Sequence, residues 1–168
     1  MGGVTGHSGV FSTAHDVGVF AQSLLDRLAG RPSEFPLAQT TLELMTAPQQ
    51  PGHRAQQLQA ANDATREAMA HRPNTKDPLL APRYPAIAGQ NLRGFGWDID
   101  TGQSTARGMV FPIGSFGHTG FTGTSLWMDP GSDTYVVLLA NSIHTRGSPP
   151  MSKLRGEVAT ATGQALRL

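Results

Sequence analysis

The feature that most constrains this sequence is a glycine-rich stretch that runs directly into two β-forming segments. Residues 117–124 read GHTGFTGT, and segments 125–128 and 134–140 follow with Pro130-Gly131 between them. Two β-rich segments joined by a Pro-Gly turn predict an antiparallel hairpin. The second segment is apolar at nearly every position, so we expect an interior strand that is buried on both faces.

Glycines recur at every third position of this stretch, at Gly117, Gly120 and Gly123. A glycine inside a strand weakens it and often marks the close approach of a ligand or of another backbone. His118 and three threonines between the glycines supply hydrogen-bonding groups. One interpretation is a strand that forms a wall of an active site. The other is an ordinary turn with a solvated histidine, and the pattern alone leaves both open.

Three motifs, in the same order along the chain, resemble the penicillin-recognising serine hydrolases, which include β-lactamases, DD-peptidases and related esterases. Residues 118–120 (HTG) resemble the third motif of that superfamily, which is most often Lys-Thr-Gly. The histidine form is similar to that of the class C-like branch. Residues 6–16 (GHSGVFSTAHD) resemble a Gly-Leu-Phe-Ser-Thr-Ala-x-Asp pattern of this branch, and residues 94–97 (GFGW) resemble a strand that precedes the third motif.

The resemblance implies an α+β fold in which helices pack on an antiparallel sheet, as in the C-terminal part of a β-lactamase/transpeptidase-like fold. It covers most of the chain outside residues 49–90. We therefore expect one partial domain over residues 1–168. It would comprise a helical segment at 1–48, a flexible insertion at 49–90, and a sheet with a C-terminal helix at 91–168.

Two helices are expected before the insertion. Thr13, followed three residues later by Asp16, is close to a capping box. Gly30 and Pro32 would end this helix, and a second one would span about 37–45. The apolar face of the first helix follows helical spacing, with Val17, Phe20, Ala21, Leu24, Leu25 and Leu28.

Later elements are predicted in the same way. Residues 92–99 are expected to form one strand and 108–111 a further one before the glycine-rich stretch. Ser148 followed by Pro149 predicts the start of a C-terminal helix that packs on the sheet. The inner face of this helix is predicted from its apolar spacing to be Leu154, Val158, Ala161, Ala165 and Leu168.

The insertion at 49–90 is rich in Gln, Ala, His, Pro and Asn and poor in large apolar residues. Residues 55–71 have helical propensity but a poor apolar stripe. His53 and His71 lie here without the spacing or the carboxylate partner of a metal site. A mobile insertion with a marginal helix is expected, and the resemblance leaves open a role at the border of a substrate cleft.

The family's reaction is acyl transfer through a serine ester, which needs an activated nucleophile and two backbone N–H groups that bind the oxyanion. The resemblance places His118 where the family's Lys stands, with Thr119 and Gly120 matching directly. It implies that the N–H of Phe121 is one oxyanion donor. Two further substrate-binding candidates come from looser matches, namely Asn141 and Arg146.

The chain lacks the two motifs that carry the nucleophile and the remaining proton-handling groups. Both lysines, Lys76 and Lys153, have a proline three positions earlier, so no Ser-x-x-Lys exists. Neither Tyr84 nor Tyr135 is followed two positions later by Asn, and no Ser-x-Asn occurs. Ser8 fails the Gly-x-Ser-x-Gly pattern, and we do not expect it to be a nucleophile.

Two hypotheses follow. The chain is the C-terminal portion of a serine hydrolase that acts on a small-molecule or peptidoglycan-like peptide or ester substrate, and it is silent without the N-terminal half of the fold. Alternatively, it is a non-catalytic module that binds a ligand or a partner by strand addition, with an unpaired sheet edge that favours self-association. A histidine at position 118 can be neutral where a lysine stays charged, which favours an esterase over an enzyme that acts on β-lactams.

Composition also bears on the possible partners and on the compartment of the protein. The formal net charge is +1, so no nucleic-acid partner is expected. The sequence contains no run of about 18 apolar residues, so no membrane-spanning helix is expected. No export signal is expected after Met1, because Gly-Gly-Val follows without basic residues. Acyl transfer needs no cofactor or metal, and none is expected. The absence of cysteine leaves the compartment open, and the resemblance suggests a periplasmic or secreted protein.

Overall fold

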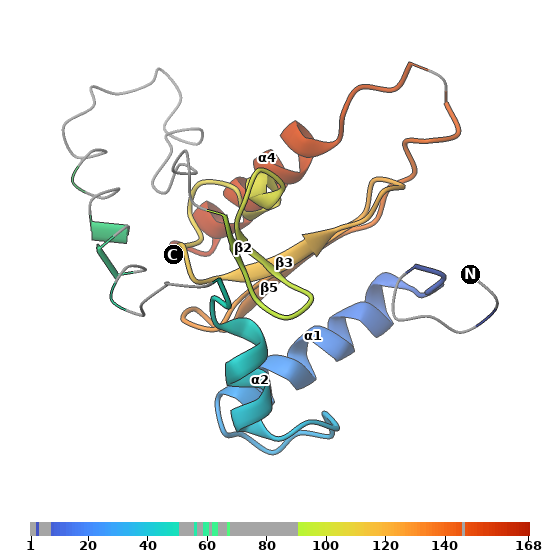
Figure 1. The fold of residues 1–168 in the computed structure, drawn as a ribbon. Helices are drawn as coiled ribbons and strands as arrows, with labels where there is room; N and C mark the ends of the chain where they lie inside the picture. Colours follow the sequence, from blue (N-terminus) through green and yellow to red (C-terminus); the bar gives the residue numbers. More distant parts are fainter. Residues whose placement is uncertain are drawn as a thin grey trace.

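The computed structural model describes residues 8–50, 91–145 and 147–168, together with positions 3, 56, 59, 60, 62, 63 and 67. Among the elements whose bounds the described residues define, α-helices lie both before and after the strands (Figure 1), and the described positions between 56 and 67 are helical as well. In chain order the elements are α1 (Ala14–Leu28), α2 (Gln39–Thr46), β1 (Leu92–Arg93), β2 (Asp98–Asp100), the 3₁₀ helix η2 (Ser104–Arg107), β3 (Phe116–Thr119), β4 (Ser125–Asp129), β5 (Thr134–Leu138) and α4 (Ser152–Ala165).

The strands form one antiparallel sheet in the order β1-β2-β3-β4-β5. α1 lies against one face with α2 beside it, and α4 lies on the other side (Figure 1). The expected α+β class, with helices packed on an antiparallel sheet, is confirmed. Among the described residues, no helix combines the length and the apolar character needed to cross a bilayer.

Each face of the sheet carries its own apolar core, because alternate residues of a strand point to opposite sides. On the α1 side, Met128 and Phe116 pack with residues that include Leu24 and Leu25. On the α4 side, Trp127 packs with a smaller cluster, formed by Ala106, Phe111 and Ala159.

The predicted start and end of the first helix are confirmed. The backbone N–H of Asp16 donates to Thr13 Oγ1 at 3.2 Å, and that hydroxyl donates to Asp16 Oδ2 at 2.9 Å. The helix ends at Leu28, just before Gly30, whose φ is +68°. The inner part of the predicted apolar face is buried, whereas Phe20 is 42% exposed and contacts the ring of Phe35. The second helix also forms, within two residues of its predicted bounds.

The prediction of one strand over 92–99 is wrong. The segment folds back on itself as β1 and β2, and residues 94–97 form the turn between them. Gly94 lies so close to the Met45 carbonyl oxygen that a Cβ there would overlap it, and Gly96 has a φ of +81°. The two glycines therefore serve a tight turn against the end of α2.

Two other strand predictions are also wrong. Residues 108–111 form a turn after η2, where Gly108 has a φ of +67° and packs against Thr160 of α4. β5 is the last strand in the sheet order, and all five of its residues are half-buried. Tyr135 and Val136 pack against the cores on opposite faces, but both stay half-buried. β5 is therefore an edge strand of the described sheet and not a fully buried interior strand.

α4 differs from its prediction in both its start and its face. It begins at Ser152 after Met151, which makes no side-chain cap, and not at Ser148. Its buried residues are Ala159, Thr160 and Gly163, whereas Leu154 is 45% exposed. Small residues face inward because the helix approaches the backbone of η2 and the following turn too closely for large side chains.

The insertion at 49–90 lies mostly outside the described residues, so its expected flexibility and the three-part division of the chain stay predictions. The helical propensity predicted at 55–71 is seen at the described positions, which are 56, 59, 60, 62, 63 and 67. His53 and His71 lie outside the described residues.

Candidate functional site

The glycine-rich stretch is not one continuous strand. β3 ends at Thr119, residues 120–124 form a turn, and β4 begins at Ser125. His118 pairs with Leu126 across the two strands, and Thr119 pairs with Ser125. The predicted hairpin of β4 and β5 is present as well, so β3, β4 and β5 form a meander.

The three glycines of the stretch each meet a different steric demand. A Cβ at Gly117 would overlap the Leu126 carbonyl oxygen and the Trp127 side chain, and one at Gly120 would overlap Thr124 Oγ1. Gly123 has a φ of +120°, a conformation that side chains rarely adopt. The predicted close approach is thus confirmed, but the approaching atoms belong to the protein itself.

The turn is closed by its own backbone. The N–H of Gly120 donates to the Thr124 carbonyl at 2.7 Å, and the N–H of Gly123 donates to the Gly120 carbonyl at 3.1 Å. Ser142, which follows β5, donates to the Thr122 carbonyl from its backbone N–H at 2.7 Å and from its hydroxyl at 3.2 Å. These bonds fix the turn at the end of the sheet.

His118 is exposed at the end of β3. Its Nδ1 lies 2.9 Å from the backbone oxygen of Thr119. A carbonyl oxygen can only accept, so Nδ1 carries the proton in this bond. Nε2 has no hydrogen-bond partner among the described residues, so it can accept a hydrogen bond when the ring is neutral and donate one when it is charged.

Phe121 lies in the turn with 90% of its surface accessible. Its backbone N–H has no acceptor among the described residues. A free N–H beside an exposed histidine is an arrangement that can bind a developing oxyanion. The role of Phe121 as a donor stays a prediction.

The remaining candidates from the sequence are Asn141, Arg146 and Ser8. Asn141 is exposed beyond β5, next to Ser142, which binds the turn. Arg146 lies outside the described residues. Ser8 is exposed in the irregular segment before α1, with a φ of +57°, and not in a strand-turn-helix setting.

The sequence analysis missed Arg155 in α4. Its Nη2 donates to the Gly120 carbonyl at 2.7 Å and its Nε donates to the Gly123 carbonyl at 3.2 Å. Burial lowers the pKa of the Arg155 guanidinium below its ordinary value. Arg155 precedes Ala159 and Gly163 at intervals of four, so a search for the small-residue face of this helix could have found it.

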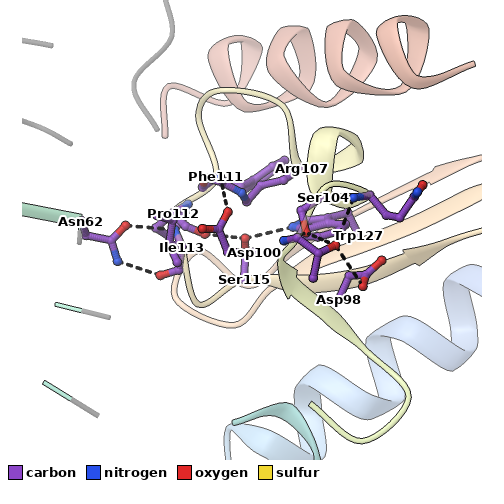
Figure 2. A network of polar contacts seen from close by, with 12 residues as sticks. Asn62, Asp98, Asp100, Ser104, Arg107, Phe111, Pro112, Ile113, Ser115 and Trp127 are labelled. Carbon is purple, nitrogen blue, oxygen red and sulfur yellow. Dashed lines mark hydrogen bonds and ion pairs between the residues drawn. The ribbon is translucent and has the colours of Figure 1, made fainter. Parts of the chain in front are cut away.

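A buried polar network lies on β2 and the segments around it (Figure 2). Arg107 Nη2 lies 3.3 Å from Asp100 Oδ1, with both side chains 1% exposed, and Arg107 Nη1 donates to the Phe111 carbonyl. Burial raises the pKa of the Asp100 carboxyl, and Arg107 opposes this shift. Trp127 Nε1 donates to Ser115 Oγ at 2.9 Å. These contacts fix the segments around β3 and are remote from solvent.

Within the part of the chain that the structure describes, no group of three or more His, Cys, Asp or Glu side chains could hold a metal ion.

Comparisons with known proteins agree with the fold. The Beta-lactamase family model matches residues 1–160. An N-acetylmuramyl-L-alanine amidase of Bacillus subtilis is 28% identical over 148 residues, which are 86% of this chain and 24% of that protein. A putative D-alanyl-D-alanine carboxypeptidase of Salmonella gallinarum is 26% identical over 152 residues, covering 89% of this chain and 26% of that protein. The chain thus spans about a quarter of the length of these relatives. No solved structure gives a significant match.

Proposed function

The chain belongs to the beta-lactamase family, and we propose that it forms the third-motif wall of a serine hydrolase site. In this proposal the chain contributes His118, Thr119, Gly120 and the N–H of Phe121. The serine nucleophile and its base come from residues outside these 168, because the chain contains neither Ser-x-x-Lys nor Tyr-x-Asn.

The observation that carries the proposal is the exposed turn at the end of β3. It presents a histidine nitrogen and a backbone N–H that have no hydrogen-bond partner among the described residues, in a stretch whose glycines are required by close packing or by backbone conformation. In acyl transfer, the nucleophile attacks a carbonyl carbon and the carbonyl oxygen becomes an oxyanion. The Phe121 N–H would stabilise that charge, and His118 would orient the substrate or exchange a proton with it.

We propose an amide or ester of a peptidoglycan-like peptide as the substrate. The relatives carry the names of an amidase and a putative D-alanyl-D-alanine carboxypeptidase. His118 need not carry a charge as a lysine does, so an ester without a carboxylate beside the scissile bond is the form we favour.

Labelling of the serine nucleophile tests this function. The isolated chain is incubated with a serine-reactive phosphonate and, separately, with a penicillin, and its intact mass is then measured. We expect no adduct, because loss of both nucleophile and base removes far more activity than loss of a single oxyanion donor. A stoichiometric adduct would contradict the proposal. Repeating the experiment with Ser8→Ala would then show whether Ser8 is the labelled residue.

A second candidate function rests on the outer edge of β5, which no described strand covers. A half-buried edge strand can pair with an added strand from a peptide, from a second copy, or from the rest of the same fold. The solution mass over a range of protein concentrations tests self-association at this edge. A strictly monomeric species at high concentration counts against it.

A further inference from the structure

We infer that Arg155 is the positioning residue that orients the Phe121 N–H, the proposed oxyanion donor. The inference deepens the proposed function and rests on it for its catalytic meaning. The contact is made across 35 residues of sequence, from α4 to the turn between β3 and β4.

The geometry of one peptide unit carries the argument. The carbonyl of Gly120 and the N–H of Phe121 belong to the same peptide, which is trans because the described backbone contains no cis bond. A trans peptide is planar, and its C=O and N–H point in opposite directions. Arg155 Nη2 holds the Gly120 oxygen at 2.7 Å, so it also fixes the direction of the Phe121 N–H.

The second contact of Arg155 prevents the turn from rotating about the first. Its Nε donates to the Gly123 carbonyl at 3.2 Å, so one rigid guanidinium binds the turn at two points. The planar fork of arginine makes such paired contacts with little loss of freedom. A lysine, with a single ammonium, could not reproduce the pair.

Arg155 makes these contacts without a carboxylate partner among the described residues, whereas Arg31, Arg93 and Arg107 all have one. Hydrogen bonds from a charged donor are stronger than those between neutral groups. They also polarise the peptide they bind, which makes its N–H a better donor. A cation placed on the carbonyl side of this peptide therefore both aims the N–H and strengthens it.

Backbone amide NMR on the 168-residue chain tests the inference without any need for turnover. In the parent protein we expect the Phe121 N–H to have an order parameter near ~0.85, typical of a rigid backbone. In Arg155→Ala it should fall below ~0.6, while the amides of Trp127 and Met128 in the core keep their values. Arg155→Lys should give an intermediate value, and it serves as the second variant if Arg155→Ala does not fold.

Lys153→Ala is the matched control, because Lys153 is a cation on the same helix that, among the described residues, pairs only with the exposed Glu157. It should leave the Phe121 amide unchanged. An unchanged Phe121 order parameter in both Arg155 variants overturns the inference.

Kinetics then separate positioning from simple stabilisation. In a longer protein that joins this chain to the proposed nucleophile and base and that hydrolyses a chromogenic ester, Arg155→Ala should lower kcat by about 10- to 100-fold, at most the lower end of the ~10²–10³-fold loss of a whole oxyanion donor. KM should change little, since the N–H acts on the transition state. A raised KM at constant kcat contradicts the inference. If such a longer protein hydrolyses neither an ester nor an amide, the proposed function fails, and the NMR measurement on the Phe121 N–H still decides the role of Arg155.

Discussion

The side chain of Asn62 binds both backbone groups of Ile113, a residue 51 positions further along the chain. Its Nδ2 donates to the Ile113 carbonyl at 2.7 Å, and its Oδ1 accepts from the Ile113 N–H at 2.9 Å. Asn62 is only 7% exposed. Figure 2 shows its side-chain amide turned toward Ile113. The Asn62 amide thus makes the two hydrogen bonds that a neighbouring strand would make with Ile113. It connects the insertion to the segment that leads into β3.

Replacing Asn62 by alanine should destabilise the protein by about 1–3 kcal/mol, because two buried backbone groups would lose their partner. Urea denaturation followed by tryptophan fluorescence would measure this change. Gln56→Ala is the control, since Gln56 is an exposed helical residue of the same insertion. Equal midpoints for the two variants would show that the Asn62 contacts do not stabilise the fold.

Asp100 should make stability depend on pH. Burial raises the pKa of this carboxyl above its ordinary value of 3.8, so the folded state binds the proton more tightly than the unfolded state. The stabilising contribution is therefore complete below pH 3.8 and is lost as the pH rises through the higher folded pKa. We expect Asp100→Asn to flatten the unfolding free energy over this window.

Denaturant titrations at a series of pH values check the prediction for Asp100. Glu157→Gln serves as the control, because Glu157 is a half-exposed surface carboxylate. A pH dependence equally steep in Asp100→Asn and the parent would refute the prediction.

Gly117→Ala should lower the melting temperature clearly. The new Cβ would overlap the Leu126 carbonyl oxygen and the Trp127 side chain, and overpacking of this kind costs about 1–3 kcal/mol. Gly102→Ala is a matched control, since a Cβ at Gly102 would meet no atom within 4 Å. Calorimetry on both variants measures the two melting temperatures. A Gly117 variant as stable as the control would mean that β3 and β4 can move apart at no cost in stability.

The face on which α4 packs can be tested with a pair of variants. A Cβ at Gly156 would lie 2.8 Å from the Thr105 carbonyl oxygen, so Gly156→Val should cost about 1–3 kcal/mol. Leu154→Ala should cost well under 1 kcal/mol, because the side chain is 45% exposed. Thermal unfolding measures both costs. If Leu154→Ala is more destabilising than Gly156→Val, the inner face predicted from apolar spacing is the correct one.

His118→Lys should improve the binding of carboxylate-bearing substrates. A lysine adds a permanent charge at an exposed position, and we expect an effect of about 1 kcal/mol, or roughly fivefold in affinity. The check is to compare KM for two esters that differ only in a carboxylate, in a complete enzyme that joins this chain to the proposed nucleophile and base. If the charged ester binds no better to the variant, the histidine does not select against carboxylates.

Local chemistry in the sequence determined several elements well. The hydroxyl of Thr13 and its bond to the Asp16 N–H start α1, and Gly30 follows its end. The turn at 129–134 joins β4 to β5. These features depend on residues within a few positions of one another, so the sequence suffices to predict them. The His-Thr-Gly motif pointed to the candidate site in a different way, through its resemblance to the third motif of a known family.

Only the tertiary structure decided those features that depend on contacts with backbone far away in the sequence. Gly94 turns the chain because the Met45 carbonyl lies against it, and α4 turns its small residues inward because Gly156 meets the Thr105 carbonyl. Arg155 reaches the turn after β3 only because that helix packs so closely. Apolar spacing favours large residues on the inner face of a helix, and it cannot anticipate a contact in which close backbone approach excludes them.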